Sequence, residues 1–343
     1  MKRIAIICVI SCMPLLSTAQ IVTPTLEDLD HEIAMSLQYD KKYESVISSV
    51  KKELHAAQTL DARYELSDKL FNLYTSYSVD SAIVYALKKQ NIAKQMGSQT
   101  KVNDAKLNLA YLMIRGGQLK DASDIINSIP RNEINKDLSF YYFSTRKTLF
   151  STLAEGSLTD WQRNNYQHLA KISNDSIVDN NASPDSWSRA EQFVNRHQYE
   201  QAKKILLDAY QKLKPSDRQM AFVTFALADI YGREKNVEAQ KQYLIAAAIS
   251  DIRNSVKEYL ALQQLAVILF EEGDTKRAYA YMGHAMNDAV FCNARQRTTA
   301  IADVWPAIEK SHERETKSRT LRLTAIIIVI SLLSVVLFVM IIY

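Results

Sequence analysis

The feature that most constrains the fold is an internal repeat with a step close to forty residues. Small and large apolar residues recur in the same order along the chain, and one alanine marks each unit. The marker alanines Ala82 and Ala122 are one step apart, and Ala202, Ala239 and Ala278 follow one another at nearly the same interval. Within a unit the apolar positions lie three and four residues apart, which is the spacing of an amphipathic helix. A period of this length is typical of a solenoid of helical repeats.

The unit at 265–285 shows the pattern most clearly. A Gly-Asp break at 273–274 separates two helices that carry, in order, Leu265, Ala266, Leu269, Phe270, Ala278, Tyr281, Met282 and Ala285. This is the pattern of a tetratricopeptide repeat (TPR), whose small residues let two antiparallel helices approach closely while larger ones fill the space between repeats. Only 7 glycines and 6 prolines occur in 343 residues, which argues against strand-and-turn folds. We therefore predict an all-α fold: a TPR-like antiparallel helix-pair solenoid followed by one C-terminal transmembrane helix.

The interval between Ala122 and Ala202 is twice the usual step, which leaves room for one degenerate repeat. Its first helix is predicted over 137–154 and its second over 158–172. The segment 174–184 (NDSIVDNNASP) is rich in Asn, Asp and Ser and is predicted to be a loop. Two interpretations stay open for this loop: a hinge between two halves of the array, or a longer surface loop.

The N-terminus has the pattern of a secretory signal peptide over residues 1–19. Lys2 and Arg3 precede a short apolar stretch, and Ser17-Thr18-Ala19 supplies the small residues of a cleavage site before Gln20. A second interpretation is a lipidation motif ending at Cys12. That interpretation leaves the apolar and small residues after Cys12 unexplained, so cleavage before Gln20 is preferred.

The C-terminus is uncharged over 323–343, LTAIIIVISLLSVVLFVMIIY. At about 1.5 Å per residue, a helix of this length spans a hydrocarbon core of about 30 Å. An exported N-terminus then predicts an inner-membrane, single-pass protein with residues 20–322 in the periplasm. Basic residues precede the span, which taken alone would favour the opposite orientation. A longer native protein, with basic residues after Tyr343, would remove this conflict.

These observations divide the chain into five segments. The signal peptide is followed by an N-terminal capping region over 20–60, with an amphipathic helix over 26–55. The TPR-like array covers 61–297. A juxtamembrane helix over 298–322, which contains Pro306, leads into the span at 323–343.

Sequence patterns of catalysis or metal binding are not found. The six histidines form no HExxH motif, and no GxSxG or Walker pattern occurs. Mature protein would keep one cysteine, Cys292, so no internal disulfide is expected. With 42 basic and 38 acidic residues and no polybasic stripe, contact with nucleic acid is not expected of this chain. We predict a binding protein without cofactor or metal rather than an enzyme.

Tyrosine is the residue type that suggests a binding surface, with 18 in the chain. TPR packing positions favour aromatic residues, so packing alone explains many of them. The alternative is that some line the concave groove, where a ring and its hydroxyl can hold a peptide or a glycan. The candidate groove residues are Tyr231, Arg233, Asn236, Tyr243 and Tyr281.

Three segments carry a resemblance beyond a generic TPR: 29–54, 73–97 and, most specifically, 246–295 (AAAISDIRNSVKEYLALQQLAVILFEEGDTKRAYAYMGHAMNDAVFCNAR). They resemble the exported half of a Bacteroidota-type family of membrane-spanning TPR transcription regulators. The resemblance implies a signal peptide, a periplasmic TPR array, one transmembrane helix, and a cytoplasmic coiled coil with a helix-turn-helix DNA-binding end. The last two parts are not in this sequence.

The resemblance implies the sensing half of a regulator, with an unidentified periplasmic protein, peptide or glycan as its partner and a homodimer as one possible state. Two other interpretations stay open: a membrane-anchored assembly scaffold without signalling, and an accessory of a carbohydrate-uptake system. All three interpretations describe binding proteins. The array alone does not choose between them, because TPR arrays serve many functions.

Overall fold

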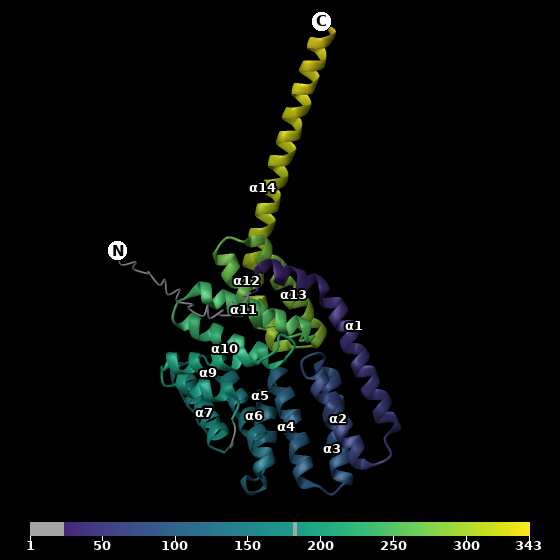
Figure 1. Ribbon diagram of the computed structural model, residues 1–343, viewed down its shortest axis with the longest axis vertical. Helices are drawn as coiled ribbons and strands as arrows, with labels where there is room; N and C mark the ends of the chain where they lie inside the picture. The colour runs from purple at the N-terminus through teal and green to yellow at the C-terminus, as the bar shows by residue number, and fades with distance from the viewer. Residues whose placement is uncertain (1–23, 181–183) are drawn as a thin grey trace, which may run out of the picture.

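The computed structural model describes residues 24–180 and 184–343, and in these ranges it contains helices and no strand (Figure 1). The predicted signal peptide and the alternative lipidation motif lie outside the described residues. A 3₁₀ turn, Arg131–Glu133, precedes α6. The helices are α1 Leu26–Ala56, α2 Leu60–Tyr74, α3 Val79–Gln95, α4 Gln99–Arg115, α5 Leu119–Asn127, α6 Lys136–Glu155, α7 Asp160–Asp179, α8 Ser186–Val194, α9 Tyr199–Lys212, α10 Gln219–Arg233, α11 Val237–Arg253, α12 Ala261–Glu271, α13 Thr275–Cys292 and α14 Arg295–Ile342.

Within the described ranges, six successive helix pairs run from α2/α3 to α12/α13, and each pair is packed together. The marker alanines account for the close approach of the two helices in a pair. Ala82, Ala122, Ala202 and Ala278 are fully buried, whereas Ala239 is half-buried. The all-α prediction and the repeat pattern are therefore confirmed. The helix expected over 26–55 is α1, and the degenerate repeat expected after Ala122 is the pair α6/α7.

Four of the six turns inside the pairs share one backbone feature. A residue four or five positions before the marker alanine adopts a left-handed conformation, with φ between 57° and 78° at Gly117, His197 and Lys235 and φ of 89° at Gly273. This conformation ends the first helix of the pair and favours glycine, because a side chain costs free energy there. His197 is not a glycine but lies at one of these positions.

The prediction of a loop over 174–184 is wrong for the first part of that segment. Residues up to Asp179 belong to α7, and the side chain of Asn174 is completely buried. Its amide nitrogen donates a hydrogen bond to the carbonyl oxygen of Ser188, 3.0 Å away. This hydrogen bond connects α7 to α8, and the choice between a hinge and a surface loop stays a prediction. Residues 181–183 lie outside the described residues.

Helix α1 contacts both ends of the array (Figure 1). Its C-terminal half packs on α2 through Ile47, Val50 and Leu54, and its N-terminal half packs on α11 around Leu29. Ion pairs reinforce the second contact, since Glu32 pairs with Arg253 and Asp30 pairs with Arg277. The predicted capping region therefore joins the first repeat to the last two.

The first and last repeats also touch directly, and we call this contact the seam. The backbone N–H of Lys257 donates to the carbonyl oxygen of Ser76 at 2.7 Å, and Asn293 donates to Asp80 at 2.9 Å. The Arg115 guanidinium pairs with Glu258. The seam joins the two ends of the solenoid, so its concave side becomes a lumen bounded by both ends of the array.

Helix α14 continues from the last repeat as a single helix of 48 residues. Ile301 and Ile308 are buried against the array, and beyond them the helix leaves the body as a rod (Figure 1). The segments predicted as juxtamembrane (298–322) and transmembrane (323–343) lie in this one helix. Its apolar part is long enough and apolar enough to cross a membrane.

Candidate functional site

The lumen contains a cavity of about 380 Å³. Its walls come from α4, α6, α8, α10 and α12, which are the first helices of five successive pairs, together with the end of α11 and the start of α14. First helices face inward because the second helix of each pair packs on the outside of the solenoid. One cavity thus receives side chains from both ends of the array, from Ser76 in the first repeat to Arg297 after the last.

Aromatic rings form one wall of the lumen cavity. Trp187 from α8 and Phe222 from α10 lie with ring centroids 5.5 Å apart, and Tyr111 and Phe225 also line the space. Phe222 is 53% exposed although it faces the inside of the molecule. A large ring left uncovered on the wall of a cavity indicates a surface for a ligand.

Two ion pairs hold charged side chains in the wall. Lys147 pairs with Glu191, whose carboxylate also accepts a hydrogen bond from the Trp187 indole N–H at 3.2 Å. This bond fixes the orientation of the indole ring. Arg115 pairs with Glu258 across the seam and also donates to the Thr75 carbonyl oxygen at the end of α2. The cavity wall and the seam therefore share side chains.

Asp251, in the last turn of α11, lines the same cavity. Burial raises the pKa of its carboxyl to about 7, the negative charge of Glu258 contributes to this rise, and Arg218 opposes both effects. Asp251 is thus able to act as a hydrogen-bond donor or an acceptor near neutral pH.

Charge in the lining is balanced. Four basic side chains (Arg115, Lys147, Arg218 and Arg297) face four acidic ones (Glu155, Glu191, Asp251 and Glu258). The cavity therefore offers many hydrogen-bonding groups with little net charge, and it suits an uncharged polar ligand.

Comparison with known families assigns the fold. The model of the SusR N-terminal TPR domain matches residues 33–303, which is most of the chain. The chain belongs to the SusR N-terminal TPR domain family. SusR is a Bacteroidota regulator, so the resemblance noted in the sequence is confirmed. No curated protein matches the chain in a sequence comparison. The TPR domain is a protein-interaction fold, and nothing in the match indicates catalysis.

In this SusR-type domain the five predicted groove residues do not come together. Tyr231 and Tyr243 stack, with centroids 5.4 Å apart and planes 3° from parallel, inside the contact between α10 and α11. Arg233 pairs with Asp229, and Asn236 caps α11 by accepting from the Ala239 N–H. Their role in binding a partner stays a prediction.

The fifth residue, Tyr281, lies apart from the other four. Its side chain is 1% exposed and its hydroxyl donates to Asp30 of α1 at 2.7 Å, so it holds α1 on α13. None of the five predicted residues is among those that line the lumen cavity. The residues that do line it were missed, although Trp187 and Phe222 could have been found as aromatic residues on the first helices of their repeats.

Among residues 24–180 and 184–343, no group of three His, Cys, Asp or Glu side chains is placed to hold a metal ion. Cys292 is buried beneath the seam as a free thiol, and burial raises its pKa to about 11. A thiol in this state is a poor nucleophile. The lumen cavity is therefore the candidate site of this SusR-type domain, and its side chains are suited to binding a ligand.

Proposed function

We propose that this chain is the exported sensing half of a single-span transcriptional regulator, and that a small ligand binds in the lumen. Membership of the SusR N-terminal TPR family supports the regulator. The observation that carries the sensing role is that Gln296 and Arg297, in the first turn of α14, line the lumen cavity. A ligand there touches the same helix that continues into the apolar segment.

A glycan is the ligand class that the cavity fits best. Its volume of about 380 Å³ lies in the range of small-molecule pockets and is too small for a folded protein. Aromatic rings pack against the C–H faces of a sugar, and paired charged side chains bind its hydroxyls. The balanced charge disfavours a ligand with a net charge. A peptide is the second candidate, as its backbone also needs paired donors and acceptors.

Signalling follows from a difference in affinity. A ligand shifts the position of α14 only if it binds one arrangement of the lumen more tightly than another. Arg297 moves with α14, so its contact with the ligand differs between the two arrangements. A shift at Arg297 is carried along an unbroken helix through Arg322 to the segment 323–343.

The same proposal includes the topology. Export by the segment 1–19 and insertion of 323–343 leave 20–322 in the periplasm and the C-terminal end facing the cytoplasm. The basic residues of α14 before the span then lie near the outer headgroups. A cytoplasmic DNA-binding part would follow the span in the complete regulator.

Tryptophan fluorescence tests ligand binding, because Trp187 lies in the lumen and Trp161 lies exposed on α7. The full chain in detergent is titrated with neutral oligosaccharides and, separately, with tripeptides. We expect a saturable change with an oligosaccharide that is lost in Trp187→Phe and kept in Trp161→Phe. Saturation by tripeptides alone would replace the glycan with a peptide. A saturable change that survives Trp187→Phe would place the ligand outside the lumen.

A further inference from the structure

The loop 254–260, which joins α11 to α12, forms part of the lumen wall. Every second residue lines the lumen cavity: Asn254, Val256, Glu258 and Leu260. Between them, Lys257 and Tyr259 are 3% and 1% exposed, and neither is among the residues that line the cavity. The side chains that anchor this loop therefore lie behind the wall that it forms.

Lys257 and His284 share one carboxylate oxygen behind this wall. The ammonium nitrogen of Lys257 lies 3.1 Å from Oδ2 of Asp288, and Nε2 of His284 lies 3.4 Å from the same atom. Lys257 also lies 2.7 Å from Oδ2 of Asp40 in α1. The ring of Tyr259 lies beside that of His284, with centroids 5.6 Å apart. The cluster thus joins the loop to α1 and α13 at one place.

A charge on His284 changes how this cluster holds the loop. From the elements around it, the imidazole faces Asp40 of α1, Lys257 and Tyr259 of the loop, and Asp288 of its own helix. While the imidazole is neutral, Asp288 keeps Lys257 as its ionic partner. A protonated imidazole pairs with Asp288 at the same oxygen and repels the Lys257 ammonium, so the loop is held less firmly.

Burial lowers the pKa of His284 below its ordinary value of 6.5. The charge of Asp288 opposes this shift, that of Lys257 adds to it, and that of Asp40 opposes it. His284 consequently takes up a proton more readily once the loop has left the cluster. Above pH 6.5 the imidazole is neutral in both arrangements, and the loop stays in place. Below this pH opening takes up a proton, which at pH 5.5 favours the open arrangement by up to about tenfold.

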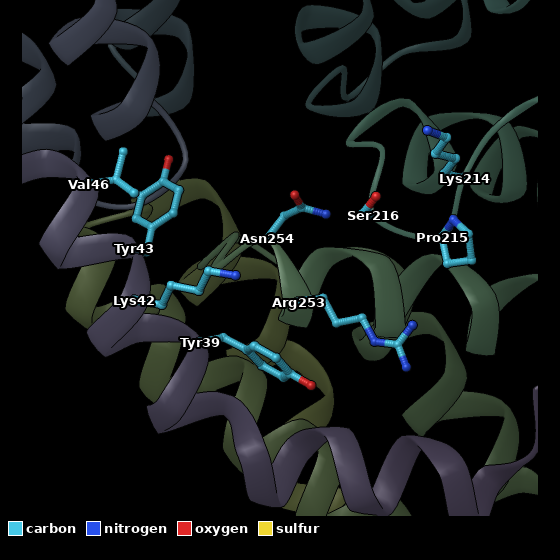
Figure 2. Close-up of a pocket in the computed structure, with 9 residues that line it drawn as sticks. All are labelled: Tyr39, Lys42, Tyr43, Val46, Lys214, Pro215, Ser216, Arg253 and Asn254. Atoms are coloured by element: carbon cyan, nitrogen blue, oxygen red, sulfur yellow. The ribbon is translucent and has the colours of Figure 1, made fainter.

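The start of the loop has room to move. Asn254 lines the lumen and also a hollow of about 790 Å³ outside it, between α1 and the loop from α9 to α10. Figure 2 shows Asn254 between Tyr43 of α1 and Ser216 of the opposite loop. Cavities on both sides leave this end of the loop less closely packed than the end held by the cluster.

We propose that the cluster of Asp40, Lys257, Asp288 and His284 positions the lumen wall, and that protonation of His284 releases it. Lys257 and His284 are positioning residues, because they act on the lumen through the loop. When the loop is released, Val256 and Glu258 leave their places in the wall, and ligand binding weakens. This effect on binding rests on the proposed function of the lumen, whereas the release of the loop does not.

Hydrogen exchange of the full chain in detergent tests the release, at pH 5.5 and 7.5 with correction for the intrinsic exchange rates. The Lys257 amide, which donates to the Ser76 carbonyl oxygen at 2.7 Å, is the reporter within the loop. We expect the loop of the natural chain to lose protection several-fold, and at most about tenfold, at pH 5.5. His284→Gln should show little of this loss. The control His168→Gln, which removes an exposed histidine of α7, should behave like the natural chain.

Equal protection at both pH values in the natural chain, or an equal loss in His284→Gln, would overturn the proposal. If glutamine at 284 already loosens the loop at pH 7.5, an NMR titration of labelled histidine in the natural chain decides. A midpoint for His284 below 6.5 is expected, and one at or above 6.5 would overturn the proposal.

Ligand binding is tested separately through Trp187 fluorescence. The affinity for a neutral oligosaccharide should fall more from pH 7.5 to 5.5 in the natural chain than in His284→Gln, and equal falls would overturn the link to the lumen. Absence of oligosaccharide binding at both pH values would instead reject the glycan ligand of the proposed function, and the exchange result would stand by itself.

Discussion

The loop that forms part of the seam carries one buried lysine, and removing its charge tests how firmly this loop is held in the closed solenoid. Lys257 is 3% exposed in the loop between α11 and α12. Its ammonium group lies 2.7 Å from an Asp40 carboxylate oxygen of α1 and 3.1 Å from one of Asp288 in α13. Lys257→Met keeps most of the side-chain volume but leaves two carboxylates facing each other with no cation between them.

The expected cost follows from the burial of the three side chains. Removing one member of a buried ion pair destabilises a protein by about 3 to 5 kcal/mol. The carboxylate side chains keep 16% and 14% of their exposure, so water partly compensates them. We therefore expect a loss near the lower end, about 3 kcal/mol, measured by urea unfolding of the full chain in detergent.

The control is Lys120→Met, which removes an ion pair with Asp124 whose side chains are 85% and 62% exposed. Solvent screens an exposed pair of this kind, so its removal should leave the urea midpoint nearly unchanged. Adding Asp40→Asn to Lys257→Met removes one of the two repelling charges and should recover part of the loss. A loss in Lys257→Met below about 1 kcal/mol, or no recovery in the double variant, would refute the role given to Lys257.

Three further predictions concern the lumen, the turns and the membrane. The pKa of about 7 at Asp251, compared with an ordinary value of 3.8, means that the folded chain keeps a proton that the unfolded chain loses between about pH 4 and 7. Stability therefore falls as pH rises through this window. Asp251→Asn does not titrate and therefore lacks this loss. Measured by urea unfolding, the free energy of unfolding of the variant minus that of the natural chain should grow by about 2 to 4 kcal/mol from pH 4 to 7.5. A constant difference would contradict the burial of this carboxyl. Gly273→Ala should cost about 1 kcal/mol because φ is 89° there, whereas Gly156→Ala, at φ −82°, should change the midpoint little; equal effects in thermal unfolding would contradict the turn argument. Deleting 323–343 should move the protein from the membrane pellet to the supernatant after ultracentrifugation, and retention in the pellet would show a second anchor.

The repeat architecture was predictable because it is a local property. The apolar spacing of a helix is visible within a short stretch of sequence, so α1 and α6 were placed to within one residue at each end, and the break between α12 and α13 was placed at 273–274. The prediction for 174–184 failed in its first part because the polar composition of this segment is typical of a loop. Asn174 instead uses its amide in a buried hydrogen bond to Ser188, which no local pattern reveals.

The site was not predictable because it depends on closure. The contact of Lys257 with Asp40 joins positions 217 residues apart, and the lumen forms only when contacts of this kind bring the two ends of the array together. Without this closure, the concave side of a TPR array is an open groove, and the tyrosines near the repeat turns are reasonable candidates for binding a partner. With it, the ring pair Trp187 and Phe222, contributed by two different repeats, becomes the aromatic surface.

The central claim is that occupancy of the lumen moves α14. Hydrogen exchange of the full chain in lipid nanodiscs tests it directly, with and without the neutral oligosaccharide that gives the largest Trp187 fluorescence change. The account predicts altered amide protection in residues 295–312 of α14 together with the lumen-lining ends of α8 and α10. Protection that changes at α8 and α10 while 295–312 stays the same would show a ligand that binds without signalling through α14, and would contradict the account.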